Sequence, residues 1–212
     1  MIKSNGIYVD KTPELYNLLE SEGPFIFCTR VKRMGKTLNL DTIKCLYEGE
    51  NDHELFKGTW IYENCKPFLE KLREEKHPVL LIEPPPFTNQ KKFLANLETS
   101  ITRYYKSPGF NINPNVSENI NFERLIKHAY YANPIKGSKE GRKVVILIDE
   151  YDKPIIDALK AFDGKDKSDL EFVIKAMHDF YLITKTQYSK IHKSIMLGTS
   201  KFSGLSILSG KS

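Results

Sequence analysis

The segment from Pro24 to Leu40, PFIFCTRVKRMGKTLNL, constrains the fold more than any other part of the chain. An apolar run, Phe25 to Cys28, leads into a basic loop that ends in Gly35-Lys36-Thr37, and helix-forming residues follow. A strand, a loop with Gly-Lys-Thr and a helix are the arrangement that wraps a phosphate chain in backbone N–H groups. The full pattern, GxxxxGK[S/T], would place its first glycine at position 30, where this chain has Arg30. Taken alone, the segment is compatible with a phosphate loop and equally with a basic surface turn.

Each part of this loop has a chemical role in the phosphate interpretation. The N–H groups of Met34, Gly35 and Lys36 can point at phosphates from the N-terminus of the following helix. The Lys36 ammonium can reach the β- and γ-phosphates, and the Thr37 hydroxyl can bind Mg²⁺. Lys32 adds positive charge, as do two arginines of the same loop. The nucleotide-binding segment that we predict comprises Arg30, Arg33, Met34, Gly35, Lys36, Thr37 and Leu38.

A second pattern lies at Val144 to Glu150, where five apolar residues end in Asp149-Glu150. A strand that is apolar throughout is usually buried on both faces, as in a parallel sheet. Asp149 would hold Mg²⁺ through water, and Glu150 would orient or deprotonate an attacking water. A buried strand with a solvated acidic end would explain one carboxylate. It does not explain why the acidic end follows a Gly-Lys-Thr loop, so the two patterns together favour phosphate binding.

A third pattern is the end of the last expected strand, Ser194 to Leu197, which runs into Gly198-Thr199-Ser200-Lys201. A polar residue at this strand end, between the other two sites, could sense the γ-phosphate. Ser200 and Thr199 are the candidates, and we assign Ser200 to the catalytic set with Lys36 and Glu150. Without the other two patterns, a plain turn would be the better explanation of these residues.

Strands and helices alternate along the chain, which predicts an α/β fold with a parallel sheet and helices on both faces. Ligands in such folds bind beyond the carboxyl ends of the strands, where all three patterns fall. Thr12-Pro13 is a typical helix start, with Thr12 as the N-cap. Residues 48 to 67 read as irregular. The expected strands are 25–29, 79–82, 144–148 and 194–197, and the expected helices begin at Thr12 and span 36–47, 68–75, 91–105, 118–131 and 169–187.

Composition limits the class of protein. The 212 residues suit a single domain, and 40% hydrophobic residues are enough to form a core. The net charge of +5 permits an anionic ligand without requiring nucleic acid. Three widely spaced cysteines fit a reducing compartment, and no apolar run reaches the length of a membrane span. We therefore expect a soluble, intracellular protein, cytoplasmic or nuclear.

Three separated blocks resemble the AAA-ATPase-like domain family: YVDKT at 8–12, TRVKRMGKTLNLDTIKCLYEG at 29–49 and LIDEYDKPI at 147–155. The run GTSKF at 198–202 also matches. The loop of that family usually reads RPRRFGK[S/T], so the absent first glycine is a trait of the family. Val31 and Met34 stand where the family has Pro and Phe. Glu83-Pro84-Pro85-Pro86-Phe87 replaces the apolar-Asp-Phe pattern that usually follows the second strand.

The resemblance implies a three-layer P-loop NTPase fold with a mostly parallel sheet and one strand inserted between the Walker A and Walker B motifs. It implies ATP and Mg²⁺ as cofactors, and it places Asp10, Lys11 and Thr12 close to the nucleotide. Family members often continue into a further strand, a helical lid and a PD-(D/E)XK nuclease-like region. Residues 1–212 would then be the ATPase domain truncated before the lid, and nucleic acid would be a partner through the absent region.

These patterns leave three functions open. The first is an ATP-binding domain that hydrolyses ATP with Mg²⁺. The second is a nucleotide-dependent binding module with little or no hydrolysis, and the third is a nucleic-acid-associated accessory domain. The chain has no guanine-reading NKxD run, but composition does not decide between ATP and GTP. The oligomeric state is left open as well.

Overall fold

The computed structural model describes residues 9–29, 34–49, 55–103, 109–162, 164 and 166–200. Within these residues four strands form one sheet, in the order β1-β4-β3-β2, and every pairing is parallel. The strands are β1 (Phe25–Thr29), β2 (Val79–Ile82), β3 (Val144–Ile148) and β4 (Ile191–Gly198). β4 lies between β1 and β3, so a strand is inserted between the loop that follows β1 and the acidic end of β3. The predicted order of the two motifs around an inserted strand is therefore confirmed.

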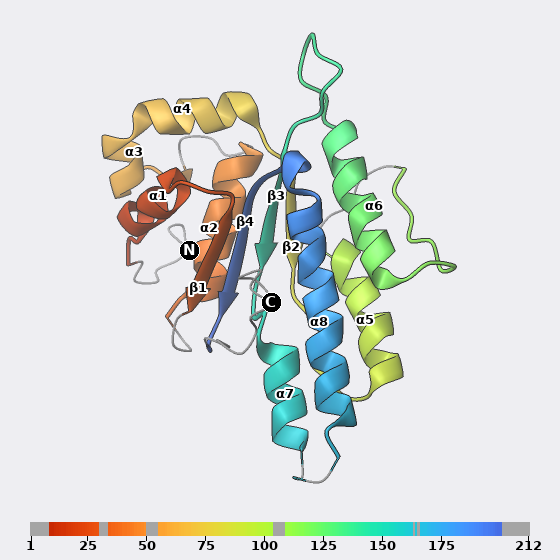
Figure 1. The fold of residues 1–212 in the computed structure, drawn as a ribbon. Helices are drawn as coiled ribbons and strands as arrows, with labels where there is room; N and C mark the ends of the chain where they lie inside the picture. The colour runs from red at the N-terminus through yellow and green to blue at the C-terminus, as the bar shows by residue number, and fades with distance from the viewer. Residues whose placement is uncertain are drawn as a thin grey trace.

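Helices cover both faces of the sheet (Figure 1). On one face lie α1 (Thr12–Glu20), α2 (Lys36–Glu48), α3 (Trp60–Asn64) and α4 (Lys66–Glu75). On the other lie α5 (Gln90–Thr102), α6 (Glu118–Tyr131), α7 (Lys153–Ala161) and α8 (Ser168–Thr186), and a short 3₁₀ turn, Tyr188–Lys190, leads from α8 into β4. The three-layer α/β architecture expected from the sequence is confirmed.

The central strands explain why the sheet has two apolar faces. Successive side chains of a strand point to opposite faces. In β3, Val145 and Leu147 pack in the cluster around α2, whereas Val144, Ile146 and Ile148 pack in the cluster around α8. All five side chains are fully buried. Each such side chain contributes about 1.5–3 kcal/mol on leaving water, so β3 is firmly fixed, and with it the carboxylates at its end.

Several element boundaries differ from the prediction. Residues 48–67, predicted to be irregular, contain α3 and the start of α4. Helix α7 was not predicted, and β4 begins three residues earlier than expected, at Ile191. Thr12 is not the N-cap of α1, because Lys11 occupies that position and the Thr12 hydroxyl instead accepts a hydrogen bond from the Ile61 N–H at 3.0 Å. Tertiary partners therefore replaced the local cap.

None of the helices in the described ranges is both long enough and apolar enough to cross a membrane.

Candidate functional site

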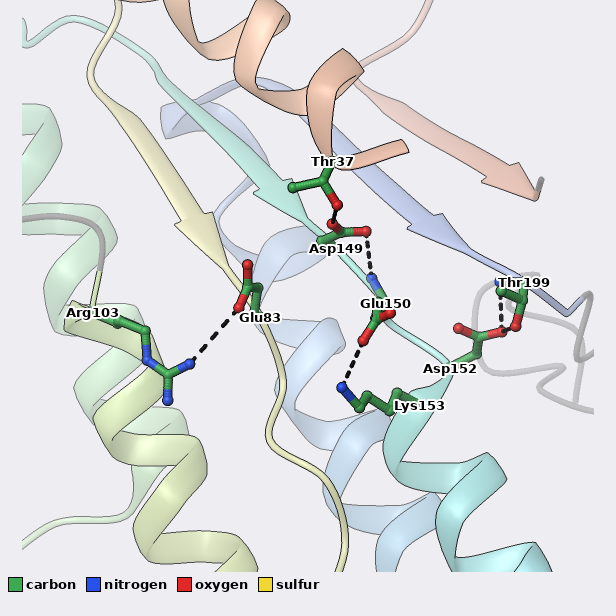
Figure 2. Close-up of polar contacts among 8 residues, drawn as sticks. All are labelled: Thr37, Glu83, Arg103, Asp149, Glu150, Asp152, Lys153 and Thr199. Atoms are coloured by element: carbon green, nitrogen blue, oxygen red, sulfur yellow. Dashed lines mark hydrogen bonds and ion pairs between the residues drawn. The ribbon is translucent and has the colours of Figure 1, made fainter. Parts of the chain in front are cut away.

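The site lies where the carboxyl ends of β1, β3 and β4 meet at one edge of the sheet. Thr37, in the first turn of α2, points at Asp149, which directly follows β3 (Figure 2). The Thr37 hydroxyl donates a hydrogen bond of 2.8 Å to Oδ2 of Asp149. The two sequence patterns that predicted a phosphate and metal site are therefore in direct contact.

The N-terminus of α2 suits an anion. Gly35 is the N-cap and has a left-handed backbone, with φ 72° and ψ 29°. A side chain would be strained in this conformation, and glycine leaves the first N–H groups of the helix without a side-chain cap. Such N–H groups, together with the helix dipole, attract negative charge. Lys36 is half-buried at the first helical position and Leu38 follows in the same turn, whereas Met34 is 50% exposed.

Arg30 and Arg33, together with Lys32, lie outside the described residues, so their predicted role in the loop stays a prediction.

Asp149 is held firmly in the site. Its side chain is buried, with 3% exposed. Oδ2 accepts from Thr37, Oδ1 accepts from the Glu150 N–H at 2.9 Å, and the Asp149 N–H donates to the Ile82 carbonyl at 3.0 Å. A hydroxyl and a carboxylate oxygen are the ligand types that Mg²⁺ takes from proteins when phosphates and water supply the rest. The residues present therefore fit the predicted cofactor.

No group of three or more His, Cys, Asp or Glu side chains among the described residues could hold a metal without such help.

Glu150 has an unusual backbone for a residue with a side chain, with φ at +48°. Left-handed backbone in a non-glycine residue is uncommon and concentrates at functional sites. The carboxylate turns toward α7, where Oε2 lies 2.7 Å from the Lys153 Nζ (Figure 2). The hydrogen bond to Glu150 raises the pKa of Lys153, and the charges of Glu150, Asp157 and Glu83 add to the increase.

A second charged pair lies at the end of the neighbouring strand. Glu83, directly after β2, is 3.8 Å from the Arg103 guanidinium (Figure 2). Both partners are substantially exposed, so the pair contributes at most about 1 kcal/mol.

Thr199 and Ser200 follow β4, as predicted, and they are bound by a residue that the sequence reasoning did not assign. Asp152 accepts hydrogen bonds from the Thr199 N–H, the Thr199 hydroxyl and the Ser200 N–H, at 2.7, 2.8 and 2.6 Å. The only sequence signal was its place in the run Asp149-Glu150-Tyr151-Asp152.

Among the described part of the loop, Lys11 is the residue of Asp10, Lys11 and Thr12 that makes a direct contact. The Lys11 ammonium donates to the Met34 carbonyl at 2.6 Å, beside the N-cap of α2. The Asp10 carboxylate instead accepts from the N–H groups of Thr12 and Trp60, at 2.9 and 2.6 Å. Partial burial opposes ionisation of Asp10, but these hydrogen bonds outweigh it and lower the pKa. Asp10 and Thr12 thus tie the start of α1 to α3, and Lys11 ties it to the loop.

Comparison with known proteins bears on the family of the chain. A family described as "Predicted AAA-ATPase", AAA-ATPase-like, matches residues 1–208. An "Uncharacterized protein in vnfD 5'region" of Azotobacter chroococcum mcd 1 is 28% identical over 206 residues, which cover 96% of this chain. The chain spans only 36% of the length of that relative. No solved structure shows significant similarity to the chain. With the family match covering nearly every residue, the chain belongs to the AAA-ATPase-like family.

Proposed function

We propose that this chain is an ATP-binding domain that hydrolyses the γ-phosphate bond of ATP in the presence of Mg²⁺. The observation that carries the proposal is the 2.8 Å hydrogen bond between Thr37 and Asp149. It joins a Gly-Lys-Thr helix start to the acidic end of a buried strand on the far side of one inserted strand. A basic surface turn would not require a buried carboxylate from a distant strand as its partner.

Each site residue would have a separate role in binding or hydrolysing ATP. The N–H groups at the start of α2 and the Lys36 ammonium would bind the phosphates and stabilise charge that develops on them. Thr37 and Asp149 would hold a magnesium ion, which supplies further charge neutralisation at the phosphate oxygens when bound. Glu150 would accept a proton from the attacking water. Ser200 would donate to the terminal phosphate, and Lys11 would hold the loop from the side of α1.

A nucleotide-dependent binding module with little hydrolysis is the second candidate. One observation favours it: the Glu150 carboxylate is engaged by Lys153 at 2.7 Å, so the proposed base is not directed only at water. The two candidates share the binding residues and differ in turnover alone.

The first experiment measures ATP binding by calorimetry for the parent chain and for Lys36→Ala. We expect Lys36→Ala to lose at least tenfold in affinity, because a cation next to the phosphates is removed. Lys44→Ala is a matched control, since Lys44 lies on the same helix and pairs with Glu48 at 3.7 Å. Equal ATP affinity for the parent chain and Lys36→Ala would contradict the phosphate-loop assignment.

The second experiment separates hydrolysis from binding. Glu150→Gln keeps the shape of the side chain but removes its basicity, so ATP affinity should be retained while multiple-turnover phosphate release falls by about 10²–10⁴-fold. Sustained phosphate release by the parent chain would exclude the binding-only candidate. Binding without release in the parent chain would favour it.

A further inference from the structure

Asp152 makes an unusually concentrated set of contacts for one side chain. It is the N-cap residue of α7 and is 1% exposed. A single carboxylate oxygen, Oδ2, accepts all three hydrogen bonds from Thr199 and Ser200 (Figure 2 shows Asp152 bound to Thr199). Hydrogen bonds to an ionised acceptor are shorter and stronger than neutral ones. The turn after β4 is therefore fixed to the segment that carries Asp149 and Glu150.

Tyr151 binds the same turn as well. Its hydroxyl donates to the Ser200 carbonyl at 2.8 Å, and its N–H donates to the Leu197 carbonyl at 3.0 Å. The Tyr181 hydroxyl in turn donates to the Tyr151 carbonyl at 2.6 Å. Gly198 leaves no spare room, because a Cβ there would lie 2.5 Å from the Tyr151 ring. Both the amide and the carbonyl of Ser200 are thus held by residues that directly follow the acidic pair.

We propose that Asp152 is a positioning residue that fixes the Ser200 hydroxyl for contact with the terminal phosphate of a nucleoside triphosphate. This inference rests on the proposed function and adds the basis on which the site distinguishes a triphosphate from a diphosphate. Asp152 does not touch the nucleotide. Because Asp149, Glu150 and Asp152 belong to one short segment, the metal-side carboxylate, the base and Ser200 keep their relative positions as a unit.

The test compares the affinities of ATP and ADP by calorimetry in the parent chain, Asp152→Asn and Ser200→Ala. In Asp152→Asn the ADP affinity should stay unchanged, and the preference for ATP over ADP should fall about tenfold, the effect of one hydrogen bond to a charged group. Ser200→Ala should reduce the preference equally, and the double variant should be no worse than either single variant. Additive losses, or an unchanged ratio in Asp152→Asn, would overturn the positioning role.

Asp157→Asn is the matched control. Asp157 lies on α7 and lines the same cavity of about 180 Å³ as Asp152 and Thr199. Among the described residues, the hydrogen bonds to Thr199 and Ser200 come from Asp152 and not from Asp157. The ratio of ATP affinity to ADP affinity in Asp157→Asn should match the ratio in the parent chain. If Asp152→Asn does not fold, Tyr151→Phe serves as the gentler variant, since it removes only the bond to the Ser200 carbonyl. A several-fold lower ratio in Tyr151→Phe supports the proposal, and an unchanged ratio contradicts it.

Hydrogen exchange keeps this inference separable from the proposed function. The amides of Thr199 and Ser200 should exchange faster in Asp152→Asn than in the parent chain, whether or not any nucleotide binds. Failure of the parent chain to bind ATP would remove the proposed function and, with it, the triphosphate role of Ser200. Unchanged amide exchange with intact ATP binding would remove the positioning role alone.

Discussion

The Thr37 hydroxyl donates to the Asp149 carboxylate across a gap of 112 residues in sequence. The bond links the first turn of α2 to the end of β3, and both groups are oxygen ligands of the kind that Mg²⁺ takes from proteins. Asp149 is nearly fully buried, so its charge is poorly screened and needs compensation. A magnesium ion bound with the nucleotide would give stronger compensation than the hydroxyl does.

Asp149→Asn should therefore remove the magnesium dependence of nucleotide binding. The parent chain is expected to bind ATP at least tenfold more tightly in Mg²⁺ than in EDTA, whereas Asp149→Asn should bind about equally in both, because an amide is a weaker ligand than a carboxylate. Calorimetry under the two conditions measures this. Asp179→Asn is the control, since Asp179 lies on α8 beside His178. A full magnesium effect in Asp149→Asn would rule out the metal-side role.

Lys153→Met should speed hydrolysis with little effect on stability. Both side chains of the Glu150–Lys153 pair are nearly half exposed, so the pair contributes about 0–1 kcal/mol. Losing it releases the Glu150 carboxylate for water, and we expect kcat to rise by roughly two- to fivefold. Lys160→Met, on the same helix and the same cavity, is the control. A marked fall in kcat would instead mean that the Lys153 ammonium assists the reaction.

The backbone strain at Glu150 can be measured by comparing two substitutions that both remove the carboxylate. Glu150 has φ at +48°, which glycine adopts freely and alanine does not. Glu150→Gly should therefore be about 1 kcal/mol more stable than Glu150→Ala in denaturant unfolding. Most positions show the opposite order, since glycine loses more chain entropy on folding. Finding that opposite order at position 150 would exclude strain as a feature of the site.

The parts of this fold that could be predicted from sequence are those with a local signal. Val144–Ile148 is apolar throughout, which predicts a buried parallel strand, and the shared edge of such strands predicts that Thr37 and Asp149 meet. The bonds from Asp152 to Thr199 and Ser200 join positions 47 and 48 residues apart. No periodicity encodes them, because they depend on how one carboxylate fits against one turn. The prediction of Thr12 as a helix cap was wrong for the same reason, because the Thr12 hydroxyl accepts a hydrogen bond from the distant Ile61 N–H instead.

Stability should fall as the pH drops from 6.5 toward 4, through His192. Burial, the stacked His77 ring at 4.0 Å and nearby lysines lower the pKa of His192 to about 4. Histidine in the unfolded chain titrates near pH 6.5. Below that pH the unfolded state binds the proton more readily than the folded state, so the equilibrium shifts toward unfolding. The contribution is full above pH 6.5 and is lost by pH 4. Allowing for partial exposure of the ring, we expect a loss of about 1–2 kcal/mol.

His192→Gln tests this assignment, because it removes the titrating group at the same place. Urea unfolding between pH 7 and pH 4 should show a shallower fall in stability for His192→Gln than for the parent chain. Parallel slopes for His192→Gln and the parent chain would assign the acid sensitivity to other groups.

Gly198→Ala should destabilise the protein by close contact rather than by backbone strain. A Cβ at this position would lie 2.5 Å from the Tyr151 ring and 2.8 Å from the Asp152 carboxylate. Tyr151 and Asp152 would therefore have to move away from the turn that contains Thr199 and Ser200. Overpacking of this kind costs about 1–3 kcal/mol, which lowers Tm by roughly 2–12 °C in a chain of this size.

Gly58→Ala is the control, because Gly58 has open space around it and φ at +82°, so only the strain of about 1 kcal/mol applies. Calorimetric melting compares the two, and a Gly198→Ala variant as stable as the parent chain would mean that the turn after β4 yields easily. In that case it could not hold Ser200 against a phosphate.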